Sequence, residues 1–129
     1  MDICSFLSKS YTAYHAVRHS VFILEKHGFC ELNLADAWKL QKGGKYYVTK
    51  NGSCVIAFVV GDNFAFNIAG SHTDSPSLHV KGNELVDSCE GKRVNVEKYG
   101  GLILYSFIDA PLKIAGRIIE EHDGKLVQK

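Results

Sequence analysis

The chain has 129 residues, of which 46% are hydrophobic and 22% are charged. This balance is typical of one modest globular core and argues against a disordered chain. Fifteen Lys and Arg residues against fourteen Asp and Glu residues give a formal net charge of +1, so charge predicts neither nucleic acid nor an anionic membrane as a partner. The apolar runs are far shorter than the roughly 20 residues of a membrane-spanning helix. The first nine residues lack the pattern of a secretory signal, which predicts a cytoplasmic protein.

The cysteines stand at wide, irregular spacings with no CxxC pair: Cys4, Cys30, Cys54 and Cys89. This spacing argues against both a zinc ribbon and a thioredoxin-type site. We expect reduced thiols that lie mostly in or near the core.

The first predicted element is an amphipathic helix that ends near His27. Apolar residues recur at the spacing of one helical face: Tyr14, Val17, Val21 and Leu24. Ser10 or Thr12 can cap its start, and Gly28 follows at the position where helices often end in a left-handed residue.

A β-hairpin is predicted from residues 46–49 and 54–60. The connection contains Asn51 and Gly52, a pair that suits the positive φ angles of a tight hairpin turn. The second run is apolar almost throughout, which is typical of a strand buried on both faces. The fold class predicted here is therefore α/β with layered packing.

A further buried strand is predicted over the apolar residues 64–69. After a polar segment, residues 93–97, 102–108 and 112–119 predict strands of a β-rich unit, with a turn at Asp123 and Gly124. Gly, Asn, Asp and Ser gather over residues 81–90, and this composition predicts a domain boundary near residue 87.

His72 and Asp74 follow the predicted strand over residues 64–69 and are the main candidates for chemistry. A neutral imidazole is a good Zn²⁺ ligand, and a nearby carboxylate can fix the ring. Taken alone, the same pattern also fits loop hydrogen bonding without a metal. His15 and His19 share a helical face, but Ala16 follows His15 where an HExxH metalloprotease has its glutamate, so we expect no metal there.

Several blocks in chain order resemble the amino-terminal part of the M18 metalloaminopeptidases, the aspartyl aminopeptidase family. The sharpest block is the segment from Gly70 to Pro76, which contains the His-x-Asp pattern. The other blocks occur in the family's order and approximate spacing: residues 6–17, 28–38, 43–53, 96–101 and 109–117.

The resemblance implies an α/β/α catalytic domain interrupted by a β-rich dimerisation domain, here residues 1–87 and 88–129. It implies that His72 is a ligand of a site with two divalent metal ions, commonly zinc, and that Asp74 orients and polarises this ligand. The implied reaction removes an amino-terminal Asp or Glu from peptides, in an enzyme that forms closed homo-oligomers. The family's other ligands and its catalytic glutamate lie beyond the equivalent of Lys129, so we expect an inactive amino-terminal fragment that binds metal weakly or not at all. The alternative is a non-enzymatic module that associates with a related subunit or another protein.

Overall fold

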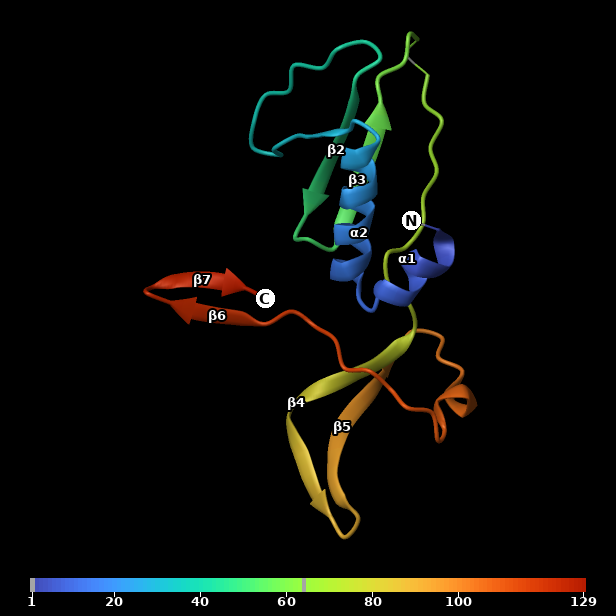
Figure 1. The fold of residues 1–129 in the computed structure, drawn as a ribbon, viewed down its shortest axis with the longest axis vertical. Helices are drawn as coiled ribbons and strands as arrows, with labels where there is room; N and C mark the ends of the chain where they lie inside the picture. Colours follow the sequence, from blue (N-terminus) through green and yellow to red (C-terminus); the bar gives the residue numbers. More distant parts are fainter. Residues whose placement is uncertain (1, 64) are drawn as a thin grey trace. The chain divides into compact units, whose positions relative to one another are not determined.

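The computed structural model describes residues 2–63 and 65–129, which form two compact units (Figure 1). The first unit runs through Asp74 and resumes at Ala115, and the second comprises Ser75–Ile114. The second unit is therefore an insertion in the sequence of the first. The predicted boundary at residue 87 lies within a strand of the second unit, and the assignment of domains stays a prediction.

Two helices open the first unit: α1 (Ile3–Lys9) and α2 (Ala13–Lys26). The prediction of α2 is confirmed, with the Thr12 side chain accepting from the His15 backbone at its start and His27 at its end. Gly28 has a φ of 79°, as expected of the residue after a helix. The sequence did not reveal α1, because seven residues are too few to display a helical period.

The sheet of the first unit has the order β1-β2-β3. Its strands are β1 (Cys30–Glu31), β2 (Lys45–Lys50) and β3 (Cys54–Val59), with β1 parallel and β3 antiparallel to β2. The predicted hairpin is confirmed: Asn51 and Gly52 have φ angles of 54° and 67°, as the tight turn requires.

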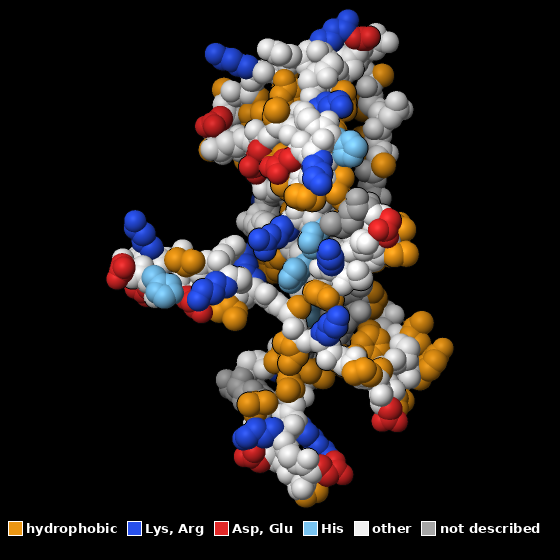
Figure 2. Space-filling model, in the orientation of Figure 1, with side chains coloured by type: hydrophobic (Ala, Val, Ile, Leu, Met, Phe, Trp, Pro, Cys, Tyr) orange, Lys and Arg blue, Asp and Glu red, His pale blue; other side chains and the backbone are white. Residues whose placement is uncertain are grey.

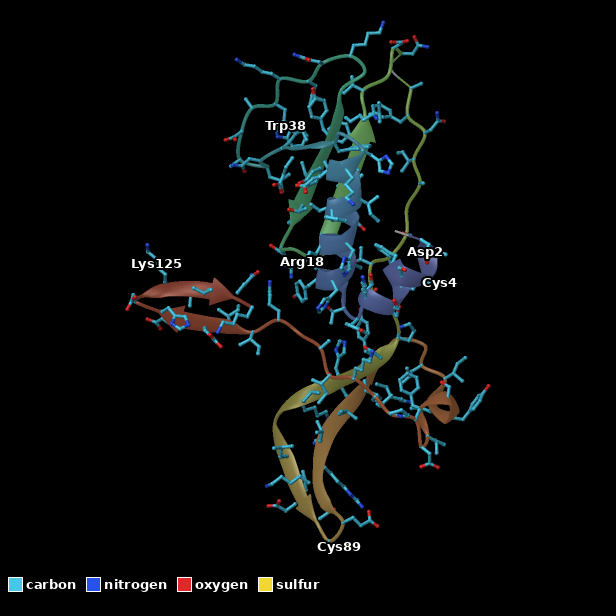
Figure 3. All side chains as sticks on the ribbon, viewed as in Figure 1. Asp2, Cys4, Arg18, Trp38, Cys89 and Lys125 are labelled. Carbon is cyan, nitrogen blue, oxygen red and sulfur yellow. The ribbon has the colours of Figure 1, made fainter. Side chains whose placement is uncertain are left out.

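The core of the first unit lies between α2 and the β2–β3 hairpin, which α2 crosses in Figure 1. Four apolar residues are buried there or beside it: Ala16, Val17, Tyr47 and Val48. Phe58 adds an aromatic cluster, with its ring centroid 5.8 Å from that of Tyr46 and 6.2 Å from that of Trp38. Trp38 is labelled in Figure 3 on the loop between β1 and β2. These contacts attach that loop to the sheet.

The expectation that β3 is buried on both faces is wrong. Ile56 is 60% exposed and Val59 is 55% exposed. The reason is that β3 is an edge strand of a three-stranded sheet, and α2 is the helix that packs against it. A continuous apolar run needs a second covering layer before both of its faces are buried.

The expected strand over residues 64–69 is also wrong for residues 65–69, which carry no strand; Phe64 lies outside the described residues. Phe66 is 76% exposed and Ile68 is 88% exposed. A strand exists only when its backbone pairs with a neighbour, and an apolar pattern does not supply that neighbour.

The second unit is built on a hairpin of β4 (Ser77–Ser88) and β5 (Gly91–Tyr99). The predicted strand over residues 93–97 is confirmed within β5. The predicted strand over residues 102–108 is wrong, because residues Leu104–Phe107 form a 3-10 helix, η1. Its turn is stabilised locally by the Ser106 hydroxyl, which donates to the Ile103 carbonyl at 2.7 Å.

From Ala115 the chain again belongs to the first unit, where it forms that unit's second hairpin, β6 (Ile119–His122) and β7 (Lys125–Gln128). The predicted turn is confirmed by positive φ angles at Asp123 and Gly124. The predicted strand over residues 112–119 is wrong in extent. Pairing from this turn reaches back to Ile118, which exchanges backbone hydrogen bonds with Lys129, so residues 112–117 have no place in the ladder.

The surface carries interspersed charges of both signs together with many apolar side chains (Figure 2). All four cysteines are free, but the expectation that they lie near the core is wrong, because all are exposed. Cys89, for example, lies at the tip of the β4–β5 hairpin (Figure 3). Within the described residues, none of the helices combines the length and the apolar character that crossing a bilayer requires.

Candidate functional site

His72 and Asp74 lie in the first unit, on the irregular segment that follows residues 65–69. The Nδ1 atom of His72 is 2.6 Å from the backbone oxygen of Asp74. Because a carbonyl oxygen only accepts hydrogen bonds, this contact assigns the ring proton to Nδ1. The lone pair of Nε2 then remains available to a ligand.

The carboxylate of Asp74 also lies beside the ring, with Oδ1 at 3.4 Å from Nδ1. The side chain of His72 is 78% exposed and that of Asp74 is 39% exposed. An imidazole whose Nδ1 is fixed by oxygen atoms while Nε2 is accessible has the arrangement usual for a metal-binding histidine. The structure thus brings the two predicted site residues together, and their roles stay a prediction.

The donor set is too small for a zinc site by itself. Catalytic zinc takes three protein ligands and leaves a further position for water or substrate. Across residues 2–63 and 65–129, the structure contains no group of three or more His, Cys, Asp or Glu side chains able to hold a metal ion. His72 therefore suits one position of a metal site, and these residues do not complete it.

Thr73 is a residue of this segment that the sequence analysis missed. Its hydroxyl donates to the backbone carbonyl of Ser53 at 2.9 Å, and the contact is partly buried. Ser53 is in the turn between β2 and β3. No sequence pattern reveals a hydrogen bond to a main-chain oxygen 20 positions away, because every residue type offers such an oxygen.

The two histidines within helix α2, His15 and His19, make contacts with neighbouring side chains. His15 Nδ1 is 2.9 Å from the Thr12 hydroxyl, and its ring stands edge-on to Tyr11. His19 packs edge-on against Phe6 with a centroid separation of 6.4 Å. The pair contributes to the start of α2 and to its contact with α1.

Residues 6–129 match the family described as Aminopeptidase I zinc metalloprotease (M18). Among proteins of known annotation, the chain is 44% identical to Probable M18 family aminopeptidase 2 of Clostridium novyi over 122 residues, covering 91% of this chain and 28% of that protein. It is 40% identical to the Aspartyl aminopeptidase of Dictyostelium discoideum, covering 99% of this chain and 28% of that protein.

Solved structures give the same result. The cryo-EM structure of the Ape4 and Nbr1 complex contains a similar chain, with a TM-score of 0.87, 36% identity and coverage of 97% of this chain and 25% of that one. The structure of the Saccharomyces cerevisiae mApe1 dodecamer matches with a TM-score of 0.82 and 32% identity, over 97% of this chain and 30% of that one.

The chain thus spans less than a third of the length of these relatives. The match nevertheless extends over almost all of the present residues, in sequence and in fold. The chain belongs to the M18 family of zinc metalloaminopeptidases.

Proposed function

We propose that this chain forms the front part of an aspartyl aminopeptidase, a metal-dependent hydrolase that removes an amino-terminal Asp or Glu from peptides. The observation that carries the proposal is the geometry of His72, whose Nδ1 is bound to the Asp74 carbonyl while its ring is open to solvent. Membership of the M18 family and the names of the relatives supply the reaction class.

In the complete site, His72 would bind one of two divalent metal ions, zinc by family, through Nε2. Asp74 would hold the ring in place through its carbonyl and raise the ligand's basicity through its carboxylate. Such an ion, when bound, lowers the pKa of a coordinated water and stabilises an oxyanion. Because the described residues offer no group of three ligands, we propose that the 129 residues alone bind metal weakly or not at all and do not hydrolyse peptides.

The proposal extends to domain organisation and assembly. Residues 1–87, which include His72, would belong to the catalytic domain, and residues 88–129 would begin the β-rich dimerisation domain. A homo-oligomer is proposed for the complete enzyme, in line with the mApe1 dodecamer among the similar structures. We propose the cytoplasm as its location.

A chimera tests the function directly. These 129 residues would replace the equivalent part of the Dictyostelium aspartyl aminopeptidase, which matches 99% of the chain. With added Zn²⁺, Mn²⁺ or Co²⁺, the chimera should hydrolyse aspartyl and glutamyl nitroanilides, and the 129-residue chain should not. A folded chimera that cleaves only leucyl substrate would contradict the proposed specificity, and hydrolysis by the short chain would contradict its proposed inactivity.

The role of His72 needs a matched histidine control. His72→Ala in the chimera should lower kcat/KM at least about 100-fold, the loss expected when a metal site is disrupted. His27→Ala changes an exposed histidine at the end of α2 and should leave the rate within about twofold of the parent. Full activity of the His72 variant would exclude the ligand role.

A second candidate function is a non-enzymatic module that associates with a related subunit. The observation that favours it is the exposed apolar surface of the first unit, at Ile56 and Val59 on edge strand β3 and at Phe66 and Ile68. Open strand edges accept strands from other chains. The candidate predicts co-elution with a full-length M18 subunit in size-exclusion runs, and separate elution would remove its support.

A further inference from the structure

We propose that Thr73 is a positioning residue for His72, and that it acts by anchoring the His72–Asp74 segment to the turn between β2 and β3. The proposal is based on the 2.9 Å hydrogen bond from the Thr73 hydroxyl to the Ser53 carbonyl. Its importance for catalysis rests on the proposed function, whereas the anchoring itself is independent of it.

The segment before His72 has no regular secondary structure. Residues 65–72 lie outside any strand or helix, and Phe66 and Ile68 are largely exposed. The bond between His72 and Asp74 is internal to the segment, so it sets the direction of the ring relative to its own backbone. The Thr73 hydroxyl adds a constraint of another kind, because its acceptor Ser53 belongs to the turn between β2 and β3.

The acceptor belongs to a turn that has further contacts within the first unit. Arg117 donates from Nη1 to the Asn51 carbonyl at 3.4 Å, and its guanidinium lies 4.5 Å from the centroid of the Tyr14 ring. That ring also lies beneath the turn, since a Cβ built on Gly52 would be 3.7 Å from Tyr14 Cδ1. The turn that carries the Ser53 carbonyl is therefore in contact with both α2 and the returning chain.

Two carbonyls of the turn, those of Asn51 and Ser53, thus accept hydrogen bonds from two distant segments of the first unit. One segment carries Arg117 and the other carries His72. Outer hydrogen bonds of this kind determine where a ligand side chain stands, because a metal site tolerates only small displacements of its donors. Thr73 thus links the position of His72 to the sheet through the main chain and its own hydroxyl, and we assign it no contact with a metal.

Paramagnetic broadening can measure the anchoring in the 129-residue chain. Cys54 is exposed and lies next to Ser53, so it can carry a nitroxide once Cys4, Cys30 and Cys89 are changed to serine. The nitroxide broadens nearby proton signals, with an effect that falls steeply with distance. In the parent, the imidazole signals of His72 should be broadened. Lys50, which is paired with Cys54 in the hairpin, provides an internal reference for an intact turn.

Thr73→Val, which keeps the shape and removes the hydroxyl, should abolish the broadening at His72 while the Lys50 amide stays broadened. Thr73→Ser, which restores a hydroxyl, should recover it. Ser71→Ala removes an exposed hydroxyl from the same segment and should change nothing. Persistent broadening at His72 in Thr73→Val would overturn the proposal. Loss at both His72 and Lys50 would also overturn it, because the hydroxyl would then support the hairpin as a whole.

The catalytic consequence is measured in the chimera. Thr73→Val should lower kcat/KM about tenfold, the lower end of the loss seen for outer hydrogen-bond partners of metal ligands, and Thr73→Ser should restore it. An unchanged rate with a displaced His72 would exclude Thr73 from positioning the reaction. If the parent chimera itself had no aminopeptidase activity, the proposed function would fail while the broadening result still decided the anchoring.

Discussion

The Tyr47 hydroxyl donates a hydrogen bond of 2.9 Å to the Glu25 carboxylate and thereby joins the middle strand of the sheet to α2. Tyr47 is 1% exposed. The pKa of the Tyr47 phenol is raised from 10.0 to about 12, mainly by burial and to a lesser extent by the hydrogen bond to Glu25. The contact is thus a structural hydrogen bond whose donor, the Tyr47 phenol, has a measurable shift in pKa.

Removing this hydroxyl should weaken the first unit. Tyr47→Phe should lower the free energy of unfolding by about 1 kcal/mol at neutral pH, since it deletes one partly buried hydrogen bond and leaves Glu25 without that donor. Urea unfolding measures the difference. Tyr105→Phe, at a side chain that is 77% exposed, is the control and should have a negligible effect. Equal stabilities for the two variants would contradict the importance assigned to this bond.

The same phenol predicts a loss of stability in alkali. The unfolded chain releases the Tyr47 proton near pH 10, and the folded chain retains it until about pH 12. The stabilising contribution is therefore complete below pH 10 and declines as the pH rises toward 12. Unfolding of Tyr47→Phe at several pH values should show a smaller decline over this window. If the free energy of unfolding declined equally in the parent and in Tyr47→Phe, the loss of stability in alkali would come from other titrating groups.

Helix α1 should depend on the ionisation of Asp2, which precedes it (Figure 3). Bonds from the Ser5 hydroxyl and backbone N–H to its carboxylate lower the pKa of Asp2 from 3.8 to about 2. The stabilisation is present above about pH 4 and is lost as the pH falls toward 2. Far-ultraviolet circular dichroism should therefore show an acid transition in the parent.

Two substitutions at Asp2 separate capping from charge. Asp2→Ala should reduce helical signal at neutral pH, whereas Asp2→Asn should retain most of it, because asparagine is an equally good N-cap. Neither variant should retain the acid transition of α1. Its persistence in Asp2→Asn would show that another carboxyl group is responsible.

Gly52 should resist substitution because of its backbone conformation. Its φ is +67°, and an added Cβ would make only ordinary contact at 3.7 Å with Tyr14. Gly52→Ala should therefore lower the free energy of unfolding by roughly 1–2 kcal/mol, the cost of the left-handed region for an L side chain. Gly61→Ala is the matched control, since an added Cβ there meets no heavy atom within 4 Å and its φ is not positive. A comparable loss in both variants would contradict the assignment to backbone strain.

Asp74 should affect metal binding without binding metal itself. In the chimera, Asp74→Asn keeps the backbone carbonyl that faces His72 and removes the negative charge 3.4 Å from its Nδ1. Metal affinity, measured by competition with a chelator, should fall by roughly 10–100-fold. Asp62→Asn changes a carboxylate paired with Lys42 at the surface and should not alter it. If the metal affinity of Asp74→Asn were undiminished, the Asp74 carboxylate would have no role in metal binding, and its backbone carbonyl alone would orient the His72 ring.

Sequence predicted the elements that are specified locally. Helix α2 has a periodic apolar face, a capping Thr12 and a terminal Gly28, and the β2–β3 hairpin has Asn51 and Gly52 at its turn. Each signal lies within a few residues of the structure that it determines. The proximity of His72 to Asp74 was predictable for the same reason, since they are two positions apart.

The predictions that were wrong all required partners distant in sequence. Residues 65–69 and residues 102–108 have strand-like composition, yet pairing rather than composition makes a strand. The burial of β3 likewise depended on what covers it. The link from Thr73 to Ser53 was beyond prediction because its acceptor is main chain.

The insertion of Ser75–Ile114 within the first unit orders the events of synthesis. A ribosome delivers the whole β4–β5 hairpin before Ala115 exists, so that hairpin can form while the first unit still lacks its last segment. Arg117 is made 66 positions after Asn51, so its contacts with the turn and with Tyr14 can form only after all the residues of the β2–β3 hairpin have been synthesised. During translation, the turn that holds His72 in place is at first secured from one side only.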